Sequence, residues 1–321
     1  MKYLILIVYI FTLVICIEFG CTSSSSSSDD SKRHDNAYKL NINLTGSLQN
    51  PAFSPDGNSI LFTRFSDGYN SGASDLYIYN LVSEETTLLI SDGESNVNLP
   101  GSSWNENINS IVFSSARDPH DEIFLISDTG STGDETQITD RTDKQSYEPT
   151  LSPDGSWIVF ESHAIDVEDD GVITKCNVNG VHVYTDLTGT DNNKQPNWSP
   201  AGGKILYQKE DKVNGIWAIW TMDEDGTHKA TITGNDESAT DAVFSNNGQW
   251  IIYSSENENV SLSNIYKIPS TGGVSTQITF YDGYDGAPSI SPDSTKIAFE
   301  SVNGDPDGSI GTRIWIIDIS L

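Results

Sequence analysis

Two acidic segments have the spacing of a calcium-binding loop. Residues 166–171 (DVEDDG) place carboxylates at the first, third and fifth positions and glycine at the sixth, and residues 303–308 (NGDPDG) nearly repeat this pattern. Alternating oxygen ligands followed by a glycine that permits a sharp turn suit Ca²⁺. The candidate metal ligands are Asp166, Glu168, Asp170, Asn303, Asp305 and Asp307.

Both segments also have a simpler interpretation. The twelfth position, an acid in calcium-binding loops, is Asn177 in one and Ile314 in the other. With 46 Asp and Glu residues in the chain, such spacings arise easily in solvated Asp/Gly turns. We therefore expect that the protein requires no cofactor. Ca²⁺ is the one cofactor that the spacing of the acidic residues would allow.

Two histidines are candidates for catalysis. His120 and His163 fall near loops expected on one face of the fold, and with a divalent metal such a pair could serve a glycan lyase or hydrolase. No His-x-His or His-Glu-x-x-His spacing accompanies them. The alternative is a pair of solvent-exposed loop histidines without a catalytic role.

Four further residues are candidates for binding a ligand. Arg64 and Arg117 are rare cations in an acidic chain and could meet a ligand carboxylate. They could equally pair locally with Asp67, Asp75, Asp118 or Asp121. Glu148 and Gln195 complete the set of binding candidates.

Charge and composition narrow the class of protein. The chain of 321 residues carries a formal net charge of -29, so phosphate backbones and acidic lipid headgroups would repel it, and nucleic-acid binding is excluded. Hydrophobic residues make up 36% of the chain, enough for a sizeable core. They occur in short runs between Gly, Ser, Asn and Asp clusters, which argues against a helical bundle or a multi-span membrane protein.

The first residues indicate export. Lys2 and the apolar run 3–17 are typical of a signal peptide, here residues 1–20, and Gly20-Cys21 followed by Thr22 and six serines resembles the lipobox of bacterial lipoproteins. That resemblance implies lipidation of Cys21 and a cell-envelope location facing the periplasm or the cell surface. Residues 21–37 then form a polar tether, with almost no apolar residue to order it. An uncleaved N-terminal anchor helix is the alternative.

The remaining chain, residues 38–321, is built of repeats. A Phe/Trp-Ser-Pro-Asp-Gly unit followed by an Ile-x-Phe strand has its aromatic or aliphatic anchor at positions 53, 104, 151, 198, 244 and 290, at intervals of 51, 47, 47, 46 and 46. This period suits a four-stranded propeller blade. The last repeat lacks an outer strand, which we expect residues 39–45 to supply by pairing with the final blade and closing the ring.

The repeat Pro-x-Phe/Trp-Ser-Pro-Asp-Gly with Ile-x-Phe resembles the PD repeats of TolB-like six-bladed β-propellers over residues 39–321. The resemblance implies an all-β fold. It leaves the function open, because such propellers include periplasmic protein-binding modules, accessory domains of peptidases and lyases. No segment remains for a peptidase domain.

We expect a non-catalytic, monomeric, lipid-anchored module. The loops between the second and third strands of the blades vary in length, as expected of a binding surface, and should face away from the membrane. The expected partner is an envelope protein, peptide or glycan. The alternative is the metal-assisted glycan lyase or hydrolase.

Overall fold

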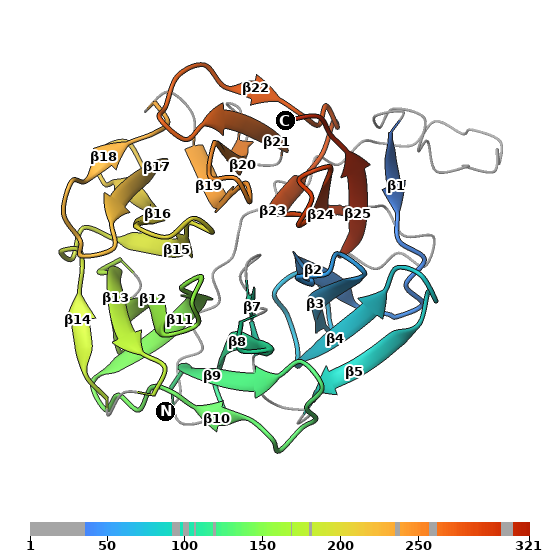
Figure 1. Ribbon diagram of the computed structural model, residues 1–321, viewed down its shortest axis with the longest axis horizontal. Helices are drawn as coiled ribbons and strands as arrows, with labels where there is room; N and C mark the ends of the chain where they lie inside the picture. The colour runs from blue at the N-terminus through green and yellow to red at the C-terminus, as the bar shows by residue number, and fades with distance from the viewer. Residues whose placement is uncertain are drawn as a thin grey trace, which may run out of the picture.

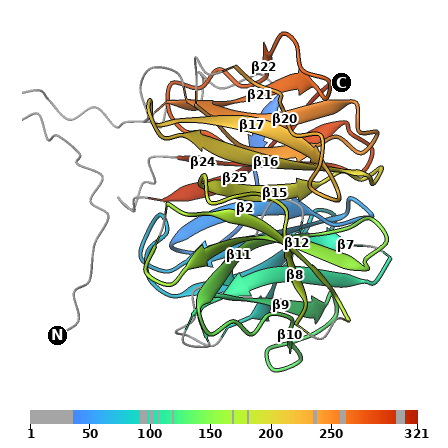
Figure 2. The same ribbon diagram turned by 90° about the vertical axis from the view of Figure 1, so that its left-hand side faces the viewer.

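The computed structural model describes residues 36–91, 97–98, 103–105, 107–117, 120–167, 169–179, 182–234, 238–256, 262–302 and 311–321. These residues form six antiparallel sheets around a central axis (Figure 1). Seen from the side, the strands run between the two faces of a disc (Figure 2). The predicted all-β, six-bladed propeller is confirmed.

The blades are numbered in chain order, and the strands of each blade follow one another from the innermost to the outermost. Blade 1 contains β2 (Ser47–Phe53), β3 (Ser59–Phe65), β4 (Ser74–Asn80) and β5 (Thr86–Ile90). In blade 2, β6 (Val97–Asn98) and β7 (Trp104–Asn105) both pair with β8 (Ser110–Ser115), which β9 (Glu122–Ser127) and β10 (Thr136–Gln137) follow. Blade 3 contains β11 (Lys144–Leu151), β12 (Trp157–Ala164), β13 (Val172–Asn177) and β14 (Tyr184–Asp186).

The second half of the ring has the same order. Blade 4 contains β15 (Asn193–Trp198), β16 (Lys204–Asp211), β17 (Ile216–Asp223) and β18 (Ala230–Thr231). Blade 5 contains β19 (Ser238–Phe244), β20 (Trp250–Glu256), β21 (Ser263–Pro269) and β22 (Thr276–Gln277). Blade 6 contains β23 (Asp285–Ile290), β24 (Lys296–Val302), β25 (Thr312–Asp318) and β1 (Ala37–Lys39).

The hydrophobic core lies between the blades. Successive side chains of a strand point to opposite faces of its sheet, so Ile111 and Phe113 of β8 pack with Leu76 of blade 1, whereas Val112 packs with Phe160 of blade 3. Clusters of this kind join each pair of neighbouring blades among the described residues. This arrangement explains why the central strands are apolar on both faces.

The Ser-Pro-Asp-Gly motif forms the tight turn between the first and second strands of a blade. In blade 1, Ser54 donates its hydroxyl hydrogen bond to Asp56 at 2.6 Å and accepts one from the Ser59 amide at 2.9 Å. Gly57 has φ of 73°, in the left-handed region that glycine adopts most readily. The same bonds recur at Ser152 and Ser291, so these turns form one uniform face, the turn face.

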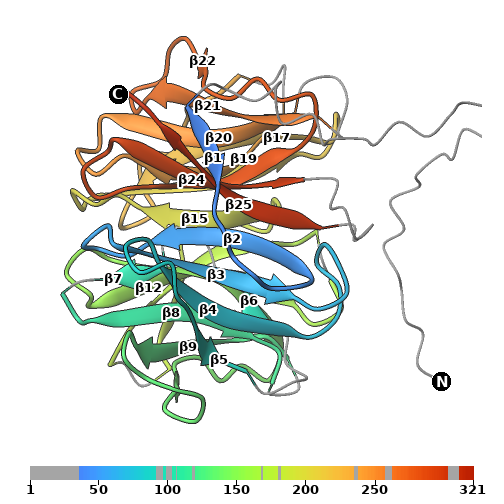
Figure 3. The same ribbon diagram turned by 90° about the vertical axis from the view of Figure 1, so that its right-hand side faces the viewer.

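The ring is closed by the N-terminal strand, as predicted. β1 pairs antiparallel with β25, with Ala37 opposite Ile317 and Lys39 opposite Trp315, and the Leu40 amide donates to the Ile314 carbonyl at 2.9 Å (Figure 3). The strand therefore lies earlier than the predicted range 39–45.

The alternation of apolar residues explains why the sequence predicts a strand over residues 39–45, whereas β1 ends at Lys39. Leu40, Ile42 and Leu44 alternate as they would in a strand, but they pack into the core cluster between blades 6 and 1 beyond the end of the β1–β25 ladder. Residues after Leu40 thus connect the rim of the disc to β2.

On the side opposite the turn face, the second strand of each blade ends and the third strand begins. The connections there that the structure describes in full are residues 66–73 and 212–215, and those of blades 2 and 3, residues 116–121 and 165–171, are described in part. We call this side the loop face.

Candidate functional site

The innermost strands share a backbone irregularity near the axis. A β-bulge interrupts the pairing in β2, β11, β15, β19 and β23. At each bulge one residue that is not glycine has a positive φ between 45° and 53°, a conformation that costs about 1 kcal/mol or more. We call them the bulge residues: Asn50, Glu148, Gln195, Asp241 and Ala287.

The bulge residues line a cavity at the propeller axis. All five contribute to its wall, together with the residues that follow them, among them Pro196, Ala242 and Pro288. The cavity volume is about 40 Å³, room for about three water molecules at 10–15 Å³ each. The network around this cavity reaches the loop face, because Tyr69 of loop 66–73 and Asp170 of loop 165–171 belong to it. We call this region the channel mouth.

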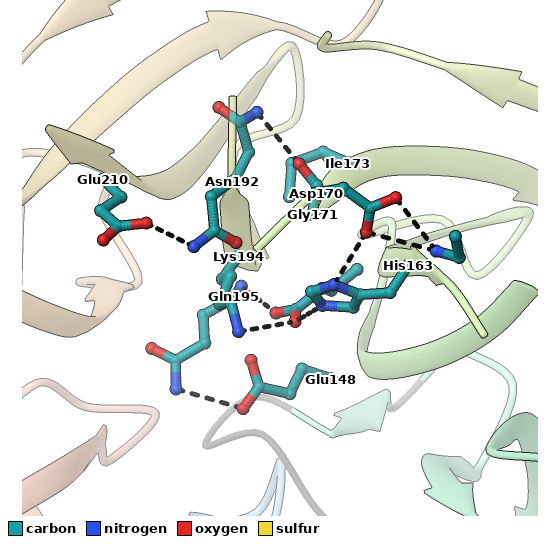
Figure 4. A network of polar contacts seen from close by, with 12 residues as sticks. Glu148, His163, Asp170, Gly171, Ile173, Asn192, Lys194, Gln195 and Glu210 are labelled. Carbon is teal, nitrogen blue, oxygen red and sulfur yellow. Dashed lines mark hydrogen bonds and ion pairs between the residues drawn. The ribbon is translucent and has the colours of Figure 1, made fainter. Parts of the chain in front are cut away.

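Gln195 connects three blades at the channel mouth. Its side-chain amide donates to Glu148 Oε1 at 3.2 Å and to Asp241 Oδ1 at 2.9 Å, and its Oε1 accepts from the Asp241 backbone amide at 3.0 Å. Its own backbone amide donates to Glu161 Oε2 at 3.2 Å. Gln195 thereby holds the carboxylates of Glu148 and Asp241 next to each other, and Figure 4 shows its contact with Glu148.

Glu161 and His163 form a buried pair beside Gln195, and Figure 4 labels His163 close to Gln195. They are two residues apart on β12, so they share a face of the sheet, and His163 Nε2 is hydrogen-bonded to Glu161 Oε1. Lys194 Nζ lies 3.7 Å from the same oxygen, and His163 Nδ1 lies 3.5 Å from Asp170 Oδ1. The carboxylate of Glu161 therefore faces two potential cations.

A second buried carboxyl lies across the mouth. Glu300 of β24 is 1% exposed and accepts hydrogen bonds from the Asn50 amide at 2.9 Å, from the Tyr69 hydroxyl at 3.1 Å and from the Tyr284 hydroxyl at 3.0 Å. Glu161 and Glu300 occupy the same position after the aromatic residue of the second strand. Each accepts the amide hydrogen of the bulge residue of the next blade, which satisfies a backbone donor that the bulge leaves unpaired.

Burial and neighbouring charges shift the pKa values of these carboxyls in different directions. Burial, and then the charge of Glu161, raise the pKa of Glu148 well above its usual range. Burial acts on Glu161 too, but the hydrogen bond from His163 and the charge of Lys194 outweigh it and lower the pKa of Glu161. For Glu300, burial outweighs the hydrogen bond from Asn50 and raises the pKa to about 7. The mouth thus holds ionised and protonated carboxyls side by side near neutral pH.

The structure brings three of the sequence candidates together and changes the interpretation of one. Glu148, Gln195 and His163 all lie at the channel mouth. His163 was expected, in the non-catalytic interpretation, to be an exposed loop residue. That expectation is wrong: His163 lies within β12 and is 3% exposed, because it shares the inward face of the strand with Glu161.

The other candidates lie elsewhere. Arg64 pairs with Asp75 at 3.0 Å, one of the acids named for local pairing, and Arg117 pairs with Glu135 at 2.9 Å, which was not among them. Arg117 also lies over the rings of Phe113 and Phe124. His120 is in loop 116–121 of blade 2.

The calcium-like segments are only partly described by the structure. Asp166 is in loop 165–171, and Asp170 in the same loop accepts from the Ala164 amide at 3.3 Å. Glu168, Asn303, Asp305 and Asp307 lie outside the described residues, as does Cys21. Within the part of the chain that is described, no group of three His, Cys, Asp or Glu residues could hold a metal ion.

Residue-by-residue reasoning missed much of the site. Asn50 and Asp241 occupy the repeat position of Glu148 and Gln195, directly before the Pro or Ala that lies three residues ahead of the serine of the Ser-Pro-Asp-Gly unit, and this periodicity could have identified them. Glu300 shares its repeat position with Glu161, after the aromatic residue of the second strand. Tyr69 and Tyr284 carry no such shared signal, because a loop of blade 1 meets blade 6 only in the closed ring.

The fold and the channel mouth define a six-bladed β-propeller with a polar axial site on its loop face. The family model described as PD40, the TolB beta propeller domain, matches residues 34–236. The chain therefore belongs to the TolB β-propeller family.

Individual proteins agree with this assignment. The chain is similar to the Tol-Pal system protein TolB of Francisella tularensis subsp. holarctica (strain OSU18), with 30% identity over 165 residues that cover 51% of this chain and 36% of that protein. The match thus spans about a third of the curated relative. A putative TolB from Agrobacterium tumefaciens superposes with a TM-score of 0.65 at 18% identity, covering 89% of this chain and 98% of that one.

An enzyme shares the same fold. Oligogalacturonate lyase from Vibrio parahaemolyticus superposes with a TM-score of 0.57 at 14% identity, covering 91% of this chain and 95% of that one. At this identity the likeness concerns the fold alone.

No helix among the described residues is long and apolar enough to cross a membrane.

Proposed function

We propose that this protein is an exported, lipid-anchored binding module that engages a protein or peptide of the cell envelope through its channel mouth and loop face. The observation that carries the proposal is the convergence of polar bulge side chains from blades 1, 3, 4 and 5 on one axial cavity. Polar groups that converge from several rigid elements on a concave surface are typical of a recognition site.

The relatives favour a protein partner over a glycan. The curated relatives are named as proteins of the Tol-Pal system, a name that refers to an assembly of proteins. The cavity volume of about 40 Å³ suits the end of a protruding side chain better than a sugar ring, because small-molecule sites have volumes of about 300–1,000 Å³.

The course of the first strand supports the proposed orientation. β1 begins opposite Ile317, near the end of β25 where Asp318 pairs with Lys296 beside the turn face. A tether that precedes β1 would therefore leave from the turn face. A protein anchored in this way would hold its loop face away from the membrane.

Photo-crosslinking tests the binding surface. A photoreactive amino acid at Tyr69, which is 43% exposed at the mouth, is expected to capture one discrete envelope protein in cells. The same amino acid at Asp154, an exposed position on the turn face, serves as the matched control and should capture none. Equal capture from the two positions would contradict a loop-face site.

Replacing the proposed lipidation site tests the anchor. Cys21→Ser should move the exported protein from the membrane fraction to the soluble fraction, because no thiol remains at position 21 to carry a lipid. Fractionation followed by immunoblotting measures the change, and Cys16→Ser provides a control inside the signal peptide. Retention of the Cys21→Ser protein in the membrane would favour the uncleaved anchor helix instead.

A further inference from the structure

We propose that the channel mouth receives a single basic side chain, an arginine or a lysine, presented by the protein partner. This inference rests on the proposed function and specifies the chemistry of that partner. The recognition groups are Glu148 and Asp241, held together by Gln195, with Glu300 across the mouth.

The two bridged carboxylates have capacity for a further donor. The amide nitrogen of Gln195 supplies one hydrogen bond to Glu148 Oε1 and one to Asp241 Oδ1. An ionised carboxylate can accept about four hydrogen bonds. Glu148 Oε2 is buried, with less than 1 Å² exposed, and accepts no hydrogen bond.

An unpaired buried carboxyl oxygen is unfavourable for the protein alone. Leaving such a group without a partner costs about 1–3 kcal/mol, and more when it is charged. Glu148 lines the axial cavity, so a donor entering there could reach it. A guanidinium or ammonium group supplies several N–H donors together with the complementary charge.

The shape of the cavity suits a long basic side chain. Its volume of about 40 Å³ accommodates only a small terminal group. Pro196, Ala242 and Pro288 contribute apolar wall beside the carboxylates. Lysine and arginine have this amphipathic character, because an alkyl stem precedes the charged head.

The surrounding charges favour a cation. Within the cluster, Lys194 and His163 both form ion pairs with Glu161. The charge of Lys194 also acts on Glu148, but burial and the charge of Glu161 outweigh it, and no ion pair to Glu148 or Asp241 is formed among the described residues. The charge of Asp241 also raises the pKa of Glu300 and, after burial, that of Glu256. The titratable groups facing the mouth are Glu148, Glu161, His163, Lys194, Asp241, Glu256, Glu300, Tyr69 and Tyr284.

The raised pKa values give binding a definite pH dependence. Glu148 and Glu300 must lose their protons to attract a cation fully, and burial opposes that loss. Affinity should therefore increase as pH rises through about 7, and binding should release protons.

A pair of matched probes tests the proposal on the full chain. N-acetyl-arginine methylamide should bind saturably by calorimetry at low ionic strength, with a Kd on the order of millimolar. N-acetyl-citrulline methylamide has nearly the same shape without the charge and should not bind. The arginine probe should bind several-fold more tightly at about pH 8 than at about pH 6.

Variants locate the binding. Glu148→Gln and Asp241→Asn should each weaken the arginine probe about tenfold, while Glu85→Gln, at an exposed position of blade 1, should not. Melting curves of each variant verify that it is folded. Equal binding of both probes, no saturable binding, or full affinity in the folded mouth variants would each overturn the inference.

Failure of this inference is distinguishable from failure of the proposed function. Capture of a partner from position 69 without arginine binding would preserve the binding module and reject the basic side chain. Arginine binding without any captured partner would preserve the cation site and reject the proposed module.

Discussion

Deleting Ala37–Leu40 should lower the melting temperature by roughly 10 °C, because it removes the strand that closes the ring. Leu40 is 7% exposed, and loss of a buried leucine side chain typically costs about 2–5 kcal/mol. The deletion also removes the ladder between β1 and β25, where each hydrogen bond contributes about 1 kcal/mol. A total loss of about 4 kcal/mol in the free energy of unfolding corresponds to a decrease of roughly 10 °C in melting temperature for a domain of this size.

A second consequence concerns association. Without β1, strand β25 (Thr312–Asp318) presents an unpaired edge, and such edges pair with other chains. The deletion protein should therefore form dimers or larger species, which size-exclusion chromatography with light scattering would detect. Deleting four residues of the serine run 23–28 shortens the chain equally and serves as the control. Identical melting curves for both deletions would contradict closure by β1.

The fold could be predicted because the residues that determine it lie close together in the sequence and recur in each repeat. Each Ser-Pro-Asp-Gly turn fixes one hairpin through short-range hydrogen bonds, such as those of Ser54 with Asp56 and Ser59. Runs such as Ile158-Val159-Phe160 are apolar on both faces because each face packs against a different blade. A period of about 47 residues then leaves few alternatives to a ring of blades.

The site was only partly predictable because its contacts depend on the closed ring. Gln195 meets Glu148 and Asp241 across separations of 47 and 46 residues, which equal the repeat period, so these three positions were available to a comparison of the repeats. Tyr69 and Glu300 are 231 residues apart and meet only in the closed ring, where blades 6 and 1 pack together. Arg64 and Arg117 are rare cations in an acidic chain, but both form local ion pairs.

Glu300→Gln should stabilise the protein at alkaline pH and have little effect at acidic pH. The pKa of Glu300 rises from 4.5 to about 7 on folding, mainly because of burial, so the folded state binds this proton more tightly than the unfolded state. Stability contributed by the protonated carboxyl is present below pH 4.5, decreases as pH rises, and is fully lost above about 7. Ionisation of Glu300 therefore lowers the free energy of unfolding by up to about 3 kcal/mol at about pH 8.

Glutamine keeps the shape of the carboxyl but cannot ionise. Its oxygen can accept from the Asn50 amide, and its nitrogen can donate to the hydroxyls of Tyr69 and Tyr284, which now donate to Glu300. Urea denaturation at about pH 8 should therefore show Glu300→Gln to be more stable than the natural protein by up to about 3 kcal/mol, with near equality at about pH 4. Glu85→Gln, on the exposed rim of blade 1, is the control and should show no such pH-dependent difference. A stability difference that stays constant with pH would mean that Glu300 binds its proton equally tightly in the folded and unfolded states, and that its three donors offset its burial.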